Sequence, residues 1–135
     1  MNMKIIIGSV FLGAASMLAI PAEAPALYQS FPAVDGLERG KWSFKPRGST
    51  QSAISMCVGD PRILFQYKHP SLSCTQTPIS NSAKTVVIGY VCSGNDQGNT
   101  TITKESNGLI QLQSQGVVNG QIFSVSLEGR YAGAC

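Results

Sequence analysis

Four cysteines and one histidine are the residues of this chain with the clearest chemical potential. The cysteines stand far apart, at positions 57, 74, 92 and 135, and no Cys-x-x-Cys pair is present. In an exported chain, such wide spacing argues against a zinc site or a redox motif and favours disulfide bonds. Four cysteines permit three pairings, so the elements around them must select one.

The stretch 71–92 selects the pairing because it reads as a β-hairpin. Residues 86–91 are rich in β-branched side chains, residues 74–79 are also extended in character, and a polar turn cluster separates them. A turn centred on Ala83 sets two cysteines directly opposite each other, and opposed antiparallel Cα atoms lie about 4.5 to 5.5 Å apart, within disulfide reach. The predicted bridges are Cys74–Cys92 and, by remainder, Cys57–Cys135.

The single histidine, His69, lacks the sequence surroundings of a catalytic group, since no carboxylate stands near it at a useful spacing. Asp60 is better explained as a helix cap. Glu105 and Glu128 fall on strands that should not be neighbours, which argues against a paired-acid mechanism. No Gly-x-Ser-x-Gly or Ser-x-x-Lys motif occurs. We therefore predict that the protein is not an enzyme, with no catalytic residue, no metal site and no cofactor.

Residues 1–24 have the pattern of a secretory signal peptide. Lys4 precedes an apolar run over residues 5–20, and small residues offer cleavage within 22–26. We expect a periplasmic rather than extracellular protein with no stable membrane span after cleavage. Beyond residue 24, nine Lys and Arg are scattered among six Asp and Glu. No basic run is present, so nucleic acid is not an expected partner.

The remaining chain predicts an N-terminal arm, 25–36, followed by a single β domain, 37–135. Alternating residues indicate strands near 40–44 and 52–58. Asp60 and Pro61 then open one short helix that Pro70 must end, because residues before proline avoid helical geometry. After the helix, a meander of four or five strands follows, which includes the hairpin at 71–92. Pro78 places its strand at a sheet edge or a bulge.

Two Asn-Gly pairs set the pairing of the last strands. A three-residue loop, 106–108, with Gly108 left-handed would place Ile102 opposite Leu112. A two-residue turn at 119–120 would place Leu112 opposite Leu127. These registers give one apolar face, against which Trp42 should be buried with Leu112, Val125 and Leu127, and one solvated face. The solvated face carries Gln111, Gln113, Gln115, Ser124, Ser126 and Glu128.

The predicted fold class is therefore mainly β. We expect an antiparallel meander that forms a strongly curved sheet or a partly open barrel, with one short helix and two disulfides.

Short motifs at the two ends of the domain suggest a relationship. Leu37-x-x-Gly40-x-Trp42 opens it, and Gly129-Arg130-x-x-Gly133-x-Cys135 closes it. In this order, with the cysteine pair between, they resemble the exported bacterial family called domain of unknown function 3617, over nearly the whole mature chain. The resemblance implies a periplasmic, disulfide-bonded, β-rich domain with structural motif residues and nothing catalytic. Family members often carry Glu after the Trp, where this chain has Ser43.

Three functions fit these expectations. The first is a non-enzymatic periplasmic interaction module that uses its polar sheet face or a sheet edge to bind a protein or a glycan. The second is a lipocalin-like carrier of a small apolar ligand inside a curled sheet, lined by aromatics that otherwise form the core: Trp42, Phe44, Phe123 and Tyr131. The third is an inhibitor of an exported hydrolase, for which an exposed charged loop such as 93–99 would serve.

Overall fold

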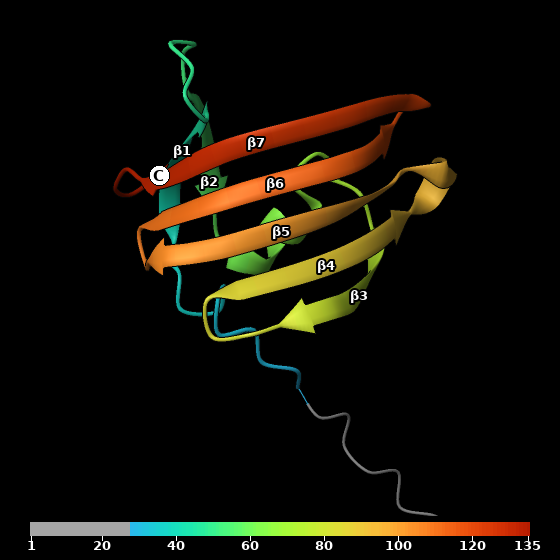
Figure 1. Ribbon diagram of the computed structural model, residues 1–135, viewed down its shortest axis with the longest axis horizontal. Helices are drawn as coiled ribbons and strands as arrows, with labels where there is room; N and C mark the ends of the chain where they lie inside the picture. The colour runs from blue at the N-terminus through green and yellow to red at the C-terminus, as the bar shows by residue number, and fades with distance from the viewer. Residues whose placement is uncertain (1–27) are drawn as a thin grey trace, which may run out of the picture.

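The computed structural model describes residues 28–135, so the predicted signal peptide lies outside the described residues. Seven strands form one antiparallel sheet in the order β2-β1-β7-β6-β5-β4-β3 (Figure 1). Their bounds are β1 Gly40–Pro46, β2 Ile54–Val58, β3 Cys74–Asn81, β4 Thr85–Cys92, β5 Gln97–Ser106, β6 Leu109–Val118 and β7 Gln121–Tyr131. Strands β3 to β7 are a meander, and β1 joins it beside β7.

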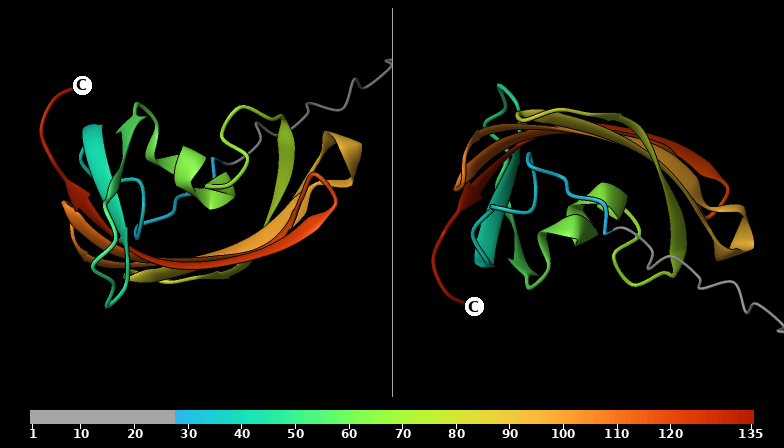
Figure 2. Two further views of the ribbon diagram at one scale, coloured as in Figure 1. Left: turned by 90° about the horizontal axis from the view of Figure 1, so that it is seen from above. Right: turned by 90° about the horizontal axis from the view of Figure 1, so that it is seen from below.

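The sheet bends strongly around a short helix without closing into a barrel, as Figure 2 shows. The fold-class prediction is confirmed, with one refinement. The helix, η1 (Pro61–Gln66), has 3₁₀ rather than α geometry, and a second short 3₁₀ segment, η2 (Ser93–Asn95), follows β4. Asp60 caps η1 as expected, because its side chain accepts a hydrogen bond of 3.0 Å from the backbone N–H of Arg62.

The hydrophobic core fills the concave side of the sheet. Trp42 is fully buried there in one cluster with Leu112 and Leu127, and Val125 packs against this cluster, as predicted. The indole Nε1–H donates to the carbonyl of Glu38 at 2.8 Å, so the one polar atom of this buried ring is satisfied. Residues 31–37 and η1 cover the opening of the bend and bury Phe31, Val34, Leu37, Leu64 and Phe65.

A salt bridge joins the two parts of this cover. Arg62 on η1 donates from Nε and Nη2 to the carboxylate of Asp35, at 2.8 and 2.9 Å, and from Nη2 to the carbonyl of Gln29. Its guanidinium also lies over the rings of Tyr28 and Phe31. The hydrogen bonds from Arg62 lower the pKa of Asp35 below its ordinary value.

Both hairpins with Asn-Gly turns have the predicted strand registers, but one of them reaches its register through a bulge rather than through a left-handed glycine. Asn119 and Gly120 both have positive φ, and Leu112 pairs with Leu127. Ile102 pairs with Leu112 as predicted. However, Gly108 does not have positive φ, so the prediction of a left-handed Gly108 is wrong. The register instead shifts at a bulge between Lys104 and Ser106.

Both predicted disulfides are present. Cys74 and Cys92 face each other across β3 and β4 with Cα atoms 4.0 Å apart. The second bridge joins Cys57 on β2 to Cys135, whose Cα atoms lie 5.9 Å apart, and fastens the last residue to the edge of the sheet. Pro78 lies on the edge strand β3 beside a bulge, as expected.

The motif residues from the two ends of the domain meet in space along the β1–β7 pairing. Gly129 lies opposite Phe44, and a Cβ on Gly129 would approach the Phe44 ring to 2.6 Å. Gly40 has positive φ and leaves no room for a side chain beside the backbone of Gly133. These glycines therefore let β1 and β7, the first and last strands along the chain, pair closely over the buried aromatic residues.

Candidate functional site

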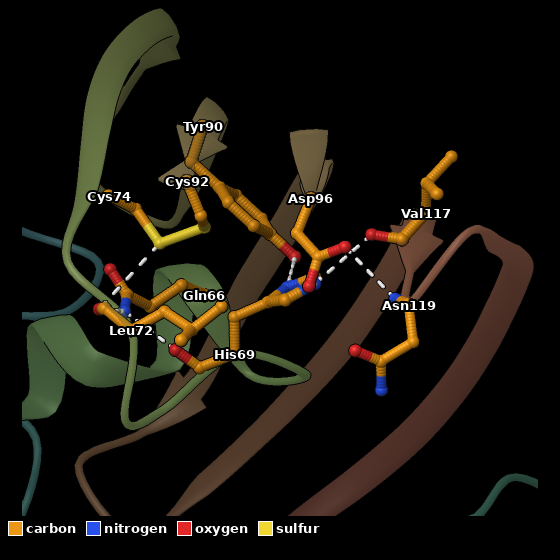
Figure 3. A network of polar contacts seen from close by, with 9 residues as sticks. All are labelled: Gln66, His69, Leu72, Cys74, Tyr90, Cys92, Asp96, Val117 and Asn119. Carbon is orange, nitrogen blue, oxygen red and sulfur yellow. Dashed lines mark hydrogen bonds and ion pairs between the residues drawn. A yellow bond between two sulfur atoms is a disulfide. The ribbon is translucent and has the colours of Figure 1, made fainter. Parts of the chain in front are cut away.

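A buried polar network surrounds His69, just beyond η1 (Figure 3). The imidazole is only 2 % exposed. Its Nδ1 lies 3.0 Å from the hydroxyl of Tyr90 on β4, and its Nε2 lies 3.1 Å from the carbonyl oxygen of Val117 on β6. The same Nε2 lies 3.5 Å from Oδ2 of Asp96, which follows η2. Two strands of the sheet and the connection between β4 and β5 thus converge on one histidine.

The partners of His69 assign its tautomer when the ring is neutral. A carbonyl oxygen only accepts hydrogen bonds, so Nε2 must carry the hydrogen that Val117 accepts. Nδ1 is then free to accept from the Tyr90 hydroxyl. Asp96 accepts a further hydrogen bond of 2.9 Å from the backbone N–H of Asn119. Burial raises the pKa of the Tyr90 hydroxyl, which keeps this donor protonated at neutral pH.

The same network anchors the loop that carries His69. Gln66, at the end of η1, donates from its side-chain amide to the carbonyls of His69 and Leu72, at 2.8 and 2.7 Å. Figure 3 shows this amide beside the Cys74–Cys92 bridge, on the opposite side of the loop from the imidazole. The rings of Tyr90 and Phe123 pack edge-on against His69. The loop is therefore held to the inner face of the sheet by polar and aromatic contacts together.

This arrangement resembles an acid–base pair in composition, but it is enclosed by the protein. The imidazole is hydrogen-bonded to Tyr90 and Val117, packs against the ring of Phe123 and lies near the Asp96 carboxylate. Ser114, a nearby hydroxyl, is itself buried and bonded to Thr100 at 2.8 Å. With so little of the ring exposed, the chemistry that the geometry supports is the satisfaction of buried polar groups.

This network could not be predicted from the sequence, because Asp96 and Tyr90 stand far from His69 along the chain. The other acidic groups lie where they were expected. Asp60 caps η1, Glu105 is exposed near the end of β5, and Glu128 on β7 is bonded to Arg130. Strand β6 separates the last two, so they form no pair. Within residues 28–135, no three His, Cys, Asp or Glu side chains gather in a metal-binding group.

A hollow of about 710 Å³ opens on the other, outer face of the sheet, across β3 to β7. This face is the one turned toward the reader in Figure 1, away from η1. Its side chains come from the positions that alternate with the buried ones: Thr75, Thr77, Ile79, Gly89, Val91, Gln97, Asn99, Gln115, Val117, Ile122 and Ser124. Tyr90, Gly98, Gly116 and Phe123 also line it.

Cross-strand rows organise the hollow. One row runs Thr77, Gly89, Asn99, Gln115, Ser124 across five strands. The next runs Thr75, Val91, Gln97, Val117, Ile122. In the first row the Ile79 side chain lies over Gly89, and three exposed aliphatic side chains line the hollow: Ile79, Val91 and Ile122. The hollow thus combines amide and hydroxyl groups with aliphatic contacts.

The hollow differs from the surrounding surface in that its lining carries no charged side chain. None of the described residues that line it is charged, although the whole chain has a formal net charge of +3. On the same face, the charged pair Glu128 and Arg130 lies further along β7, where hydrogen bonds from Arg130 and Gln111 lower the pKa of Glu128. A smaller hollow of about 220 Å³ continues the uncharged surface through Thr101, Gln113 and Ser126.

Together, the fold and its surface define a disulfide-braced antiparallel β module with a sealed inner face and an open, uncharged outer hollow. No family model, curated protein or solved structure matches the chain. In the described part of the chain, no helix is long and apolar enough to cross a membrane. The two disulfides fit an exported protein, since such bonds persist in oxidising compartments.

Proposed function

We propose that this protein is a non-enzymatic interaction module of the periplasm that binds a polypeptide partner through its outer hollow. The observation that carries the proposal is the uncharged hollow of about 710 Å³ between β3 and β7, where the exposed aliphatic side chains of Ile79, Val91 and Ile122 stand beside amide and hydroxyl groups. Exposed aliphatic groups of this kind supply binding energy by burial, and amides beside them pair with a partner's backbone. The resemblance to the domain of unknown function 3617 family agrees with an exported module without catalytic residues.

The type of side chain in the hollow favours a polypeptide over a nucleic acid. The two aromatic residues that line it, Tyr90 and Phe123, are buried, at 2 % and 9 % exposed. They offer no open ring on which a base could stack. With no charged lining residue, the hollow also lacks the cations that a phosphate backbone would need.

The alternatives are less well supported by the same structure. A lipocalin-like carrier would hold its ligand on the concave side, yet Phe31, Leu64 and Phe65 occupy that space. An inhibitor acting through the loop at 93–99 would use exposed charge. The only charged residue of that loop, Asp96, is buried beside His69. The outer hollow remains the accessible surface with the features of a binding site.

Site-specific photo-cross-linking in the producing cells tests the proposal. A photoreactive amino acid at Gln115, inside the hollow, should form a covalent adduct with a polypeptide of defined mass. The matched control places the same group at Ile54, which is 65 % exposed on the edge strand β2. Equal labelling from both positions, or no polypeptide adduct from Gln115, would count against the hollow as a binding site.

A further inference from the structure

Basic side chains that are scattered along the sequence gather on the outer face where β1 pairs with β7. Lys41 and Lys45 are exposed on the outer side of β1, because Trp42, which alternates with them, is buried on the inner side. Arg130 on β7 lies opposite Ser43, the residue midway between the two lysines. Three cationic side chains therefore surround the short side chain of Ser43, at roughly 5 to 7 Å along and across the strands.

A fourth cation and one carboxylate complete this group, which we call the basic patch: Lys41, Lys45, Arg47, Arg130 and Glu128. Glu128 lies opposite Lys45 and accepts a hydrogen bond of 2.7 Å from Arg130. Hydrogen bonds from Arg130 and Gln111 lower the pKa of Glu128 most, and the nearby charge of Arg47 adds to this effect. Within residues 28–135, the ion pair between Arg130 and Glu128 is the only one that these four cations form. The basic patch thus keeps positive charge that its own carboxylate does not balance.

The basic patch continues the surface of the outer hollow. Ser124 lines the hollow, and Glu128 lies four residues further along β7 on the same face, at about 13 Å. Between them, Ser126 lines the smaller uncharged hollow. The outer face in Figure 1 therefore passes from aliphatic side chains, through hydroxyl and amide groups, to cations. One extended polypeptide is long enough to contact both ends.

Charge complementarity selects the chemistry that binds at the cationic end. Neighbouring cations repel one another, so an anion placed among them lowers the free energy more than a neutral group does. Arg47 and Arg130 also carry planar guanidinium groups, whose paired donors match the two oxygens of a carboxylate. In a polypeptide, Asp and Glu side chains supply such carboxylates on the same chain that makes the aliphatic contacts.

We infer that the polypeptide bound by the outer hollow is acidic at one end of its contact, and that its Asp or Glu side chains bind the basic patch around Ser43. This inference rests on the proposed function and specifies the chemistry of its partner.

Two synthetic peptides test the inference with the oxidised protein. Each has about ten residues, with Val and Thr alternating in one half; the other half alternates Thr with Glu in one peptide and Thr with Gln in its twin. In titrations followed by amide chemical shifts at low salt, the Glu peptide should bind about tenfold or more tightly than the Gln peptide. The shifts should extend along β7 from Ile122 to Arg130. Added salt should reduce the difference, because it screens exposed charges.

Substitutions at Ser43 separate charge from size. Ser43→Glu leaves every cation in place but adds a carboxylate among them, so it should weaken binding of the Glu peptide about tenfold. Ser43→Gln, which has the same size without the charge, should lose much less. Ser71→Glu adds the same charge to the exposed loop between η1 and β3 and should leave the affinity unchanged. Glu128→Gln removes the competing carboxylate and should strengthen binding of the Glu peptide.

Each outcome decides between the two proposals. Equal affinity for the two peptides, no binding of the Glu peptide, or an equal loss in Ser43→Glu and Ser43→Gln overturns the acidic partner. Phosphatidylglycerol vesicles that co-sediment with the wild type but not with Ser43→Glu, without binding of the Glu peptide, would assign the basic patch to lipid headgroups instead. If the acidic partner fails but Gln115 still cross-links to a polypeptide, the interaction module stands. If no adduct forms either, both proposals fail.

Discussion

The two faces of the sheet are built from neighbouring residues of the same strands, yet they differ in almost every property. The inner face is sealed by η1 and residues 31–37, and its polar groups around His69 are hydrogen-bonded within the protein. The outer face is open and uncharged over the hollow, with exposed amides and aliphatic side chains. Residues that look reactive in the sequence are enclosed, while residues that look unremarkable form the accessible surface.

This difference has a simple physical origin. Alternation along a strand sends successive side chains to opposite faces, so each strand divides its residues between the two environments. A buried imidazole or carboxylate must find partners inside the protein, which removes it from contact with a ligand. An exposed amide keeps its hydrogen-bonding groups available. The comparison predicts that substitutions on the inner side act on stability and those on the outer side act on association.

The largest effect should come from the centre of the inner face. Trp42→Ala is expected to lower the free energy of unfolding by about 3 to 5 kcal/mol, since it leaves a large cavity among Phe44, Leu112 and their neighbours. Urea unfolding measured by far-ultraviolet circular dichroism gives the value. A loss below 1 kcal/mol would mean that the indole is not part of the packed core.

Removing the imidazole should have the next largest effect. His69→Phe keeps a ring against Tyr90 and Phe123 but leaves the Tyr90 hydroxyl and Asp96 short of a partner, at a cost of about 1 to 3 kcal/mol. His69→Gln offers both a donor and an acceptor and should lose less. Unfolding curves of the two variants decide the matter. If His69→Phe is as stable as the wild type, the network does not stabilise the fold.

The cap of η1 should contribute less. Asp60→Ala removes the hydrogen bond to the backbone N–H of Arg62 and should destabilise the protein by about 1 kcal/mol. Asp60→Asn retains an accepting oxygen and serves as the control. Thermal unfolding of the three proteins at one pH measures the difference. An equal loss in both variants would show that the charge, rather than the cap, matters.

The Asp35–Arg62 pair should add a small, pH-dependent contribution. Because Arg62 lowers the pKa of Asp35, the pair stabilises the fold above the ordinary carboxyl pKa of 3.8, and the stabilisation is lost as the pH falls through the lower folded pKa. Asp35→Asn should therefore cost about 0.2 to 1 kcal/mol at neutral pH, a range typical of partly exposed pairs. Urea unfolding at several pH values should show this cost shrinking below pH 3.8.

The smallest effect on stability should come from the outer face. Gln113→Ser exposes no new apolar surface and breaks no contact in the core, so its free energy of unfolding should stay within about 0.5 kcal/mol of the wild type. Urea unfolding, the assay used for the substitutions on the inner face, measures this free energy of unfolding on the same scale. A loss comparable to that of His69→Phe would erase the distinction between the two faces.

Local features explain why much of the architecture was predictable from the sequence. The Asn119–Gly120 turn set the β6–β7 register, the polar cluster around Ala83 marked the turn between β3 and β4, and Asp60 marked the start of η1. The bulge between Pro78 and Ser80 then brings Cys74 opposite Cys92. Each of these depends on residues within one turn or hairpin, where geometry is fixed by a few backbone angles. Gly108 shows the limit, because a bulge gave the same register without a left-handed glycine.

The sequence alone determined the antiparallel pairing, the two disulfides and the division of each strand into a buried and an exposed set. Only the tertiary structure decided what meets on each side: His69 with Asp96, Gly40 with Gly133, and Ile79 with Gly89. The first two pairs lie on elements that are not consecutive, and their distances depend on how far the sheet bends and on what packs inside the bend. That curvature results from the packing of the whole core, which no short stretch of sequence encodes by itself.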